Sequence, residues 1–429
     1  MPTIITGASV TSEGIVTNTL GTSNFVAGVN AGNSITSGGN YNTVVGDEAG
    51  TAITTGDNNT FVGYTAGDAT TTAGNNTAVG YKALTANTTG NENTSLGFQA
   101  LRDSTTATGN TAVGMNSLAL NTTGGDNVAV GRDALISNTT ASNNTAVGKS
   151  ALTSNTTGTR GSALGNLALS SNTTGNNNTA LGSQSLQANT TANDNTAVGY
   201  ASLNVNTTGS SNTAVGKGAL IANTTGANNV AVGKSALVVN TTGAGNTALG
   251  LETLQANTTA NYNTAVGFQA LALNTTGTYD TASGYRALFN NTTGSYNAAY
   301  GRLSLEANTT GNENTAIGNA ALYLSTTGIN NTSVGSASLG ANTTGSHNTS
   351  VGQSALPVST TGQYNVASGY ESLKANTTGS GNTGIGRQSG DTTTSGNYNI
   401  FVGPSTRGAG TTNDQEIVIG TQGGGNVVG

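Results

Sequence analysis

The sequence has no cysteine and no tryptophan, and only 7% of its 429 residues are charged. Without cysteine, a disulfide framework and thiolate metal sites are excluded. Twelve basic and 18 acidic residues give a net charge of −6, so no basic stripe for nucleic acid and no polybasic patch for membranes is expected. No run of about 18 apolar residues occurs, so a transmembrane helix is not expected either.

Groups suited to catalysis are scarce as well. His347 is the only histidine, and acids such as Asp126 and Asp133 are scattered without a recurring pair. A glycosidase needs two carboxylates at a set separation. The Gly-x-Gly string at Gly384 and Gly386 precedes no helix that could bind a phosphate. The sequence therefore predicts no enzyme activity, no cofactor and no metal site, and it places His347 in a solvated turn.

The dominant feature of the chain is a glycine that recurs every 17 residues. The series runs from Gly46 to Gly420 without insertion or deletion, which gives 23 glycines in register. We take this glycine as position 0 and number the other positions of each repeat relative to it. A constant period of this kind is typical of stacked, nearly identical units, each of which buries its apolar side chains against its neighbours.

Other positions of the repeat are almost as regular as the glycine. Position −4 is Asn in 20 of the 23 repeats, position +4 is Leu in 18 consecutive repeats, and positions +8 and +9 are Thr-Thr in the same 18. Position −1 is usually Val, Leu or Ile. In the repeat of Gly199 these positions hold Asn195, Val198, Leu203, Thr207 and Thr208.

These repeats predict strands rather than helices, because Asn-Thr-Thr-Gly forms helices poorly. Short β-branched runs bounded by Gly and Asn indicate strands and turns. We expect an all-β parallel β-roll or β-solenoid of about 23 coils, each with two short strands and two turns, stacked about 4.8 Å apart. The expected divisions are an N-terminal cap or partial repeat (1–40), regular repeats (41–389) and atypical C-terminal repeats or a cap (390–429).

The columns predict where side chains lie. Val198 and Leu203 are expected in the interior, and Asn195 in a ladder of stacked amides. Gly199 is expected to adopt a backbone conformation closed to other residues or to allow a close approach. Ala197 at −2 alternates with Val198 and is therefore expected to face outward, packed against another chain. For Thr207 and Thr208 we expect that the hydroxyl groups stabilise the turn.

Tyrosines are the leading candidates for binding a partner. Six of them lie at position −5 and five at position +1. Three occupy position −5 of consecutive coils and should form an exposed ladder, with two more aromatic residues in the other turn nearby. Such a row can stack on sugar rings or anchor a partner, although tyrosines can also simply shield strand edges. The residues are Tyr262, Tyr279, Tyr296, Phe268 and Tyr285.

The string Asn-Thr-Ala-Val-Gly, followed by Ala-Leu and Asn-Thr-Thr-Gly, resembles two groups of proteins over about residues 41–420. One is the repeat shaft of phage and virus tail-fibre proteins, and the other is the head domain of trimeric autotransporter adhesins. The resemblance implies a homotrimer of three rolls on a virion or at the cell surface, with a cell-surface glycan or receptor as a possible partner. The repeat is longer than that of adhesin heads, and no heptad stalk, membrane anchor or C-terminal chaperone domain is recognisable.

Four functions follow as hypotheses. The first is a structural fibre shaft of a virion or surface appendage, with possible host attachment. The second is a bacterial adhesin head, and the third is a filament subunit that joins end to end. The fourth and weakest is an ice-binding solenoid, suggested by the threonine columns; adjacent threonines point to opposite faces, so only one column would face outward.

Overall fold

The computed structural model describes residues 9–11, 14–16, 19–420 and 427–428. Every regular element among them is a strand, and most strands have three residues. The chain divides into two units, residues 1–211 and 212–429. The predicted all-β parallel solenoid of about 23 turns, with 17 residues in each turn, is confirmed.

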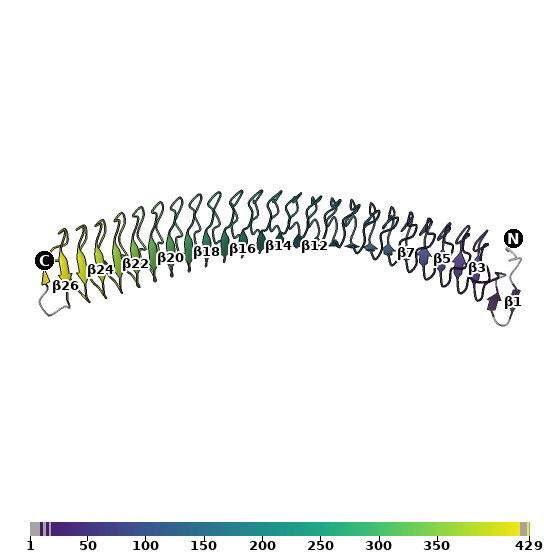
Figure 1. Cartoon of the computed structure of the whole chain (residues 1–429), viewed down its shortest axis with the longest axis horizontal. Coiled ribbons are helices and arrows are strands. Elements are labelled where there is room, and N and C mark those ends of the chain that lie inside the picture. Colours follow the sequence, from purple (N-terminus) through teal and green to yellow (C-terminus); the bar gives the residue numbers. More distant parts are fainter. Residues whose placement is uncertain (1–8, 12–13, 17–18, 421–426, 429) are drawn as a thin grey trace. The chain divides into compact units, whose positions relative to one another are not determined.

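The first unit contains β1 to β13, and the strands follow one another along one side of the stacked turns (Figure 1). Their bounds are β1 Ser9–Thr11, β2 Gly14–Val16, β3 Phe25–Ala27, β4 Thr43–Val45, β5 Thr60–Val62, β6 Thr77–Val79, β7 Thr94–Leu96, β8 Thr111–Val113, β9 Val128–Val130, β10 Thr145–Val147, β11 Ser162–Leu164, β12 Thr179–Leu181 and β13 Thr196–Val198.

The second unit has the same construction and contains β14 to β27. Their bounds are β14 Thr213–Val215, β15 Val230–Val232, β16 Thr247–Leu249, β17 Thr264–Val266, β18 Thr281–Ser283, β19 Ala298–Tyr300, β20 Thr315–Ile317, β21 Thr332–Val334, β22 Thr349–Val351, β23 Val366–Ser368, β24 Thr383–Ile385, β25 Ile400–Val402, β26 Ile417–Ile419 and β27 Val427–Val428.

Each turn contributes one strand, not the two that the sequence analysis expected. Within each unit, successive strands between β4 and β26 pair in parallel with a shift of 17 residues, as in the pairing of Thr77 with Thr94. At the two ends, β1 pairs with β2 and β26 with β27 in antiparallel fashion. The rest of the turn is also bonded to the next turn: the Leu84 N–H donates to the Ala100 carbonyl at 3.0 Å, and the Thr88 N–H to the Thr105 carbonyl at 2.8 Å. This part lacks strand geometry because residues such as Leu84 have a left-handed backbone, with φ of 55°.

In most turns the interior is thin and holds one large apolar side chain. Leu203 at +4 is fully buried, and so are Ala197 at −2 and Ser202 at +3. Val198 at −1 is only partly buried. The expectation that Val198 faces inward and Ala197 outward is therefore wrong. The leucine fills most of the room between the strand and the opposite wall, so only a small side chain fits on the inner side of the strand.

The register glycine is required for two reasons. Gly199 has a φ of 123°, which side-chain-bearing residues rarely adopt. A Cβ atom at Gly182 would lie 2.6 Å from the carbonyl oxygen of Gly199 in the next turn. The glycine column thus provides both an unusual backbone conformation and a close approach between turns.

Candidate interaction surface

The outer face of the strands is built from positions −3 and −1, since position −2 points inward. In β13 these are Thr196 and Val198, both partly exposed. Larger −1 residues are more exposed, for example Leu164 at 51% and Tyr300 at 44%. Neither column contains a charged residue anywhere from β4 to β26. Position −3 is mostly Thr, whereas position −1 is apolar in all described turns from β4 to β26 except those of Ser283 and Ser368. We call the −1 column the apolar stripe.

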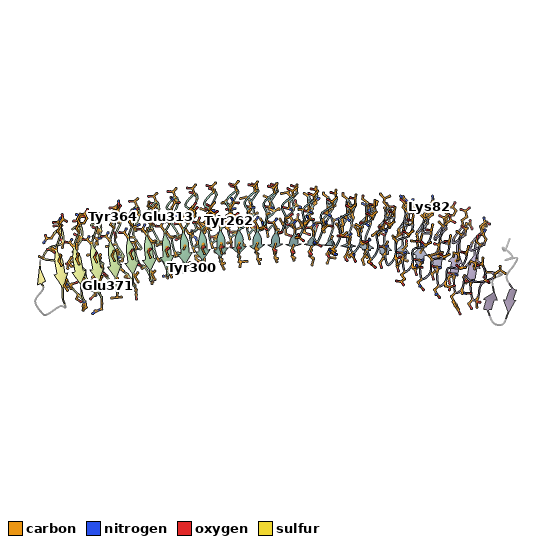
Figure 2. The ribbon with its side chains drawn as sticks, viewed as in Figure 1. Lys82, Tyr262, Tyr300, Glu313, Tyr364 and Glu371 are labelled. Carbon is orange, nitrogen blue, oxygen red and sulfur yellow. The ribbon has the colours of Figure 1, made fainter. Side chains whose placement is uncertain are left out.

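Position −5 lies at the edge of this face, and its aromatic residues stack on each other. Tyr262 and Tyr279 have ring centroids 5.2 Å apart and nearly parallel planes, and Tyr279 and Tyr296 are 5.1 Å apart. All three have a left-handed backbone near φ 60°, and all three side chains are exposed. In Figure 2, Tyr262, Glu313 and Tyr364 follow one line on one side of the strands of the second unit, and Glu371 lies on the other side.

Position +1 lies at the opposite edge of the same face. Phe268 and Tyr285 stack there with centroids 5.5 Å apart. No ring contact joins these two residues to the tyrosines at −5 within the described chain. The five aromatic residues that the sequence analysis singled out therefore form two separate ladders and not one cluster.

Sequence analysis missed other aromatic stacks of the same kind. At position +1 of the first unit, Tyr81 stacks on Tyr64 at 5.6 Å and on Phe98 at 5.2 Å. At position −5 of the second unit, His347 lies parallel to Tyr364 at 4.9 Å and is exposed. The 17-residue spacing of these residues was the signal that could have identified both stacks.

The geometry of the ladders limits what they can bind. The rings are nearly parallel with centroids about 5 Å apart, which is the offset-stacked arrangement. Within a ladder, each ring therefore covers part of the face of its neighbour, and mainly the ring edges and hydroxyl groups are left toward the surroundings. Stacking on a sugar requires an open ring face, so the ladders are better suited to lateral contacts with side chains.

Beneath the surface run two ladders of buried asparagines. At position −4, the Asn93 amide donates to the Asn76 side-chain oxygen at 3.2 Å and to the Ala107 carbonyl at 2.8 Å. The Asn93 N–H also donates to the same Asn76 oxygen, at 2.9 Å. Asn195 is fully buried in this column. The ladder satisfies polar groups that would otherwise be buried without partners.

The second ladder, at position +7, was not predicted. Asn206 is fully buried; its amide donates to the Asn189 side-chain oxygen at 3.0 Å and to the Gly209 carbonyl at 2.9 Å. The sequence analysis assigned Thr207 and Thr208 to a turn, and the regular Asn that precedes them was the available signal for the ladder. The buried amide is fully engaged in packing the turn.

The threonines after this asparagine have different surroundings. At position +8, the Thr190 hydroxyl donates to the Thr207 carbonyl at 3.2 Å, and the same bond recurs along the column. Thr208 at +9 is exposed, whereas Thr207 is partly buried. The +8 hydroxyls therefore bond one turn to the next, and of the two threonine columns at +8 and +9 only the +9 column is exposed.

One member of the −4 ladder is an acid. Asp280 is fully buried; one carboxylate oxygen accepts bonds from the Asn297 N–H at 2.8 Å and the Asn297 amide at 3.1 Å, and the other accepts from the Asn291 amide at 3.2 Å. Burial raises the pKa of Asp280 from 3.8 to about 7, and the bonds from Asn297 oppose this rise. The group is enclosed in the ladder and belongs to the packing of the turn.

Among the described residues, no group of three or more His, Asp or Glu side chains is placed to hold a metal ion. The described part of the chain also contains no helix able to cross a membrane. No family model matches the sequence, and no curated protein matches it significantly. The apolar stripe and its two edges are thus the main candidate for a functional surface.

Proposed function

We propose that this chain is a structural shaft segment of a fibre, on a virion or a cell surface, in which parallel copies pack side by side as a homotrimer. The observation that carries the proposal is the apolar stripe, which is partly or fully exposed, contains no charged residue and recurs from turn to turn within each unit. Exposed apolar surfaces of this continuity mark sites of association.

The periodicity of the stripe favours further copies of the same chain as its partner. Its side chains recur at the spacing of parallel strands, about 4.8 Å. A partner that covers the stripe over many turns has to repeat at the same spacing, and a parallel copy does so. The resemblance to trimeric rolls supplies the copy number of three, with the three stripes facing a common axis.

The rest of the turn suits the role of a shaft. In each unit the backbone is hydrogen-bonded from turn to turn, and two buried asparagine ladders reinforce it. The tyrosine ladders do not extend the proposal to glycan binding, because each ring covers part of the face of its neighbour. The proposed role is therefore mechanical, as a spacer or scaffold.

Light scattering on the full chain tests this proposal. We expect the mass of three copies of the 42.0 kDa chain. Leu164→Glu places a charge on the stripe and should lower the mass with little change in circular dichroism. The control Thr157→Glu places the same charge on the exposed +9 column and should leave the mass unchanged. A monomeric native chain, or equal behaviour of both variants, would contradict the proposal.

A further inference from the structure

The two edges of the outer face carry matched side chains in the second unit. Each tyrosine at −5 has a ring, a guanidinium or a proline at +1 of the same turn, and each of these groups can pack against the open edge of an aromatic ring. Conversely, each aromatic residue at +1 has a tyrosine at −5. The pairs are Tyr262 with Phe268, Tyr279 with Tyr285, Tyr296 with Arg302, Tyr364 with Tyr370, and Tyr398 with Pro404.

These matches cannot arise from contacts within one turn. Positions −5 and +1 are six residues apart across an extended segment, which spans up to about 20 Å. Each ring instead stacks along its own column, as Tyr279 does on Tyr262 and Tyr296. Stacking along a column explains why rings occur in consecutive turns. It does not explain why rings in both columns occur in the same turns.

The two edges also differ in charge, and the difference is complementary. In the described repeats, position +1 holds six cations and one acid, whereas position −5 holds four acids and one cation. Acids at +2 reduce the positive charge, as where Asp133 pairs with Arg132 at 3.2 Å. Even with position +2 included, cations outnumber acids at that edge. Asp126 at −5 has Arg132 at +1 of its own turn. One edge is therefore acidic and the other basic.

We infer that neighbouring copies of the chain run parallel and in register, with the −5 column of one copy against the +1 column of the next. Any arrangement in which copies are related by rotation about an axis along the stack brings these two edges together at equal height. Rings then meet rings, and acids meet the basic edge. An antiparallel pair would set −5 against −5 and lose the match. This inference rests on the proposed association and adds its register and its edge contacts.

The aromatic match is confined to the second unit. In the first unit, the rings of Tyr64, Tyr81 and Phe98 at +1 belong to turns that have Asn58, Asn75 and Glu92 at −5. The inference on ring contacts therefore concerns the turns between Tyr262 and Pro404. In these turns, the tyrosines at −5 form the interaction surface, and the +1 column of a second copy of this chain contacts them.

Cysteine cross-linking tests the register directly, because the chain has no native cysteine. The in-register variant carries Tyr279→Cys and Tyr285→Cys. The offset control carries Tyr279→Cys and Gln353→Cys. Gln353 also stands at position +1, but four turns after Tyr285, which is about 19 Å along the stack. Both partner positions are exposed. A short bifunctional maleimide is applied to each full-length variant, and the products are separated under denaturing conditions.

We expect covalent oligomers from the in-register variant, and only single chains from the offset variant and from Tyr279→Cys alone. An oligomer by light scattering that cross-links only in the offset variant, or through Tyr279→Cys alone, would overturn the register and leave the proposed association intact. An oligomer without any cross-link would also overturn the edge contact. A monomer by light scattering would overturn both proposals.

Discussion

The ring of Phe61 occupies the space in which most turns hold a leucine side chain. A Cβ atom at Gly67 would lie only 2.5 Å from Cε2 of Phe61. In the common turn, position −2 is Ala and position +4 is Leu; here they are Phe61 and Gly67. The two positions thus exchange their volumes, and the interior stays filled because Phe61 is fully buried.

We predict that this exchange is reciprocal. Gly67→Leu overfills the turn and should cost about 1–3 kcal/mol of stability, whereas Phe61→Ala leaves a cavity and should cost about 3–5 kcal/mol. The double variant restores the common pair and should be much more stable than the sum of the two costs implies. Thermal melts of the four proteins measure the coupling. Additive losses would show that the ring and the glycine do not share one space.

A second prediction distinguishes the two sides of the strand. Leu203→Asp buries an unpaired carboxylate in a fully buried position and should destabilise the unit by about 4 kcal/mol or more. Val198→Asp places the same group on the outer face, where solvent reaches it in the single chain. Its effect should fall on the native mass rather than on the melting temperature of the monomer. Equal losses of melting temperature would argue against this assignment of inside and outside.

The period of the fold was predictable from the sequence, whereas the direction in which each strand faces was not. The 17-residue glycine series implies stacked turns, and the Asn at −4 implies an amide ladder. Alternation says only that Ala197 and Val198 point to opposite sides. The more apolar residue was taken as internal, but the room left beside Leu203 decides the matter, and it admits only the small side chain. The room inside a turn depends on all the side chains that share it, so it cannot be inferred from one position of the repeat.

The candidate surface was predictable only in part, because the sequence shows the spacing of its residues but not their positions in the folded turn. The spacing of Tyr262, Tyr279 and Tyr296 implies a ladder, and they do stack. Their separation from Phe268 and Tyr285 depends on the course of the chain between the columns. The +7 ladder of Asn206 was missed because an Asn-Thr-Thr triplet is equally typical of an exposed turn, and only the fold shows that its amide points inward.

The third prediction concerns pH. The pKa of Asp280 rises from 3.8 to about 7 on folding, so between about pH 4 and pH 7 the folded state binds more protons than the unfolded state. Stability should therefore fall as the pH rises through this window and level off above it, by at most about 4 kcal/mol for this group. Asp280→Asn should abolish that slope and raise the melting temperature at pH 8. Asp194→Asn, at an exposed position, is the control. A slope that persists in Asp280→Asn would assign it to other groups.

The fourth prediction tests the asparagine ladder at +7. The Asn155 amide donates to the Asn138 side-chain oxygen and to the Gly158 carbonyl, each at 2.9 Å, and its oxygen accepts from the Asn172 amide at 2.9 Å. Asn155→Ala removes all three bonds and leaves the buried Asn138 side-chain oxygen without this donor. The Gly158 carbonyl, in contrast, keeps the Asn144 amide, and the Asn172 amide keeps the Gly175 carbonyl. The substitution should cost about 2–3 kcal/mol. Asn166→Ala, at an exposed +1 position, should cost less than about 0.5 kcal/mol. Thermal melting of both variants, with hydrogen exchange across the neighbouring turns, checks this. If the two variants melt alike, the buried ladder does not contribute to stability, and cohesion between turns rests on the backbone bonds alone.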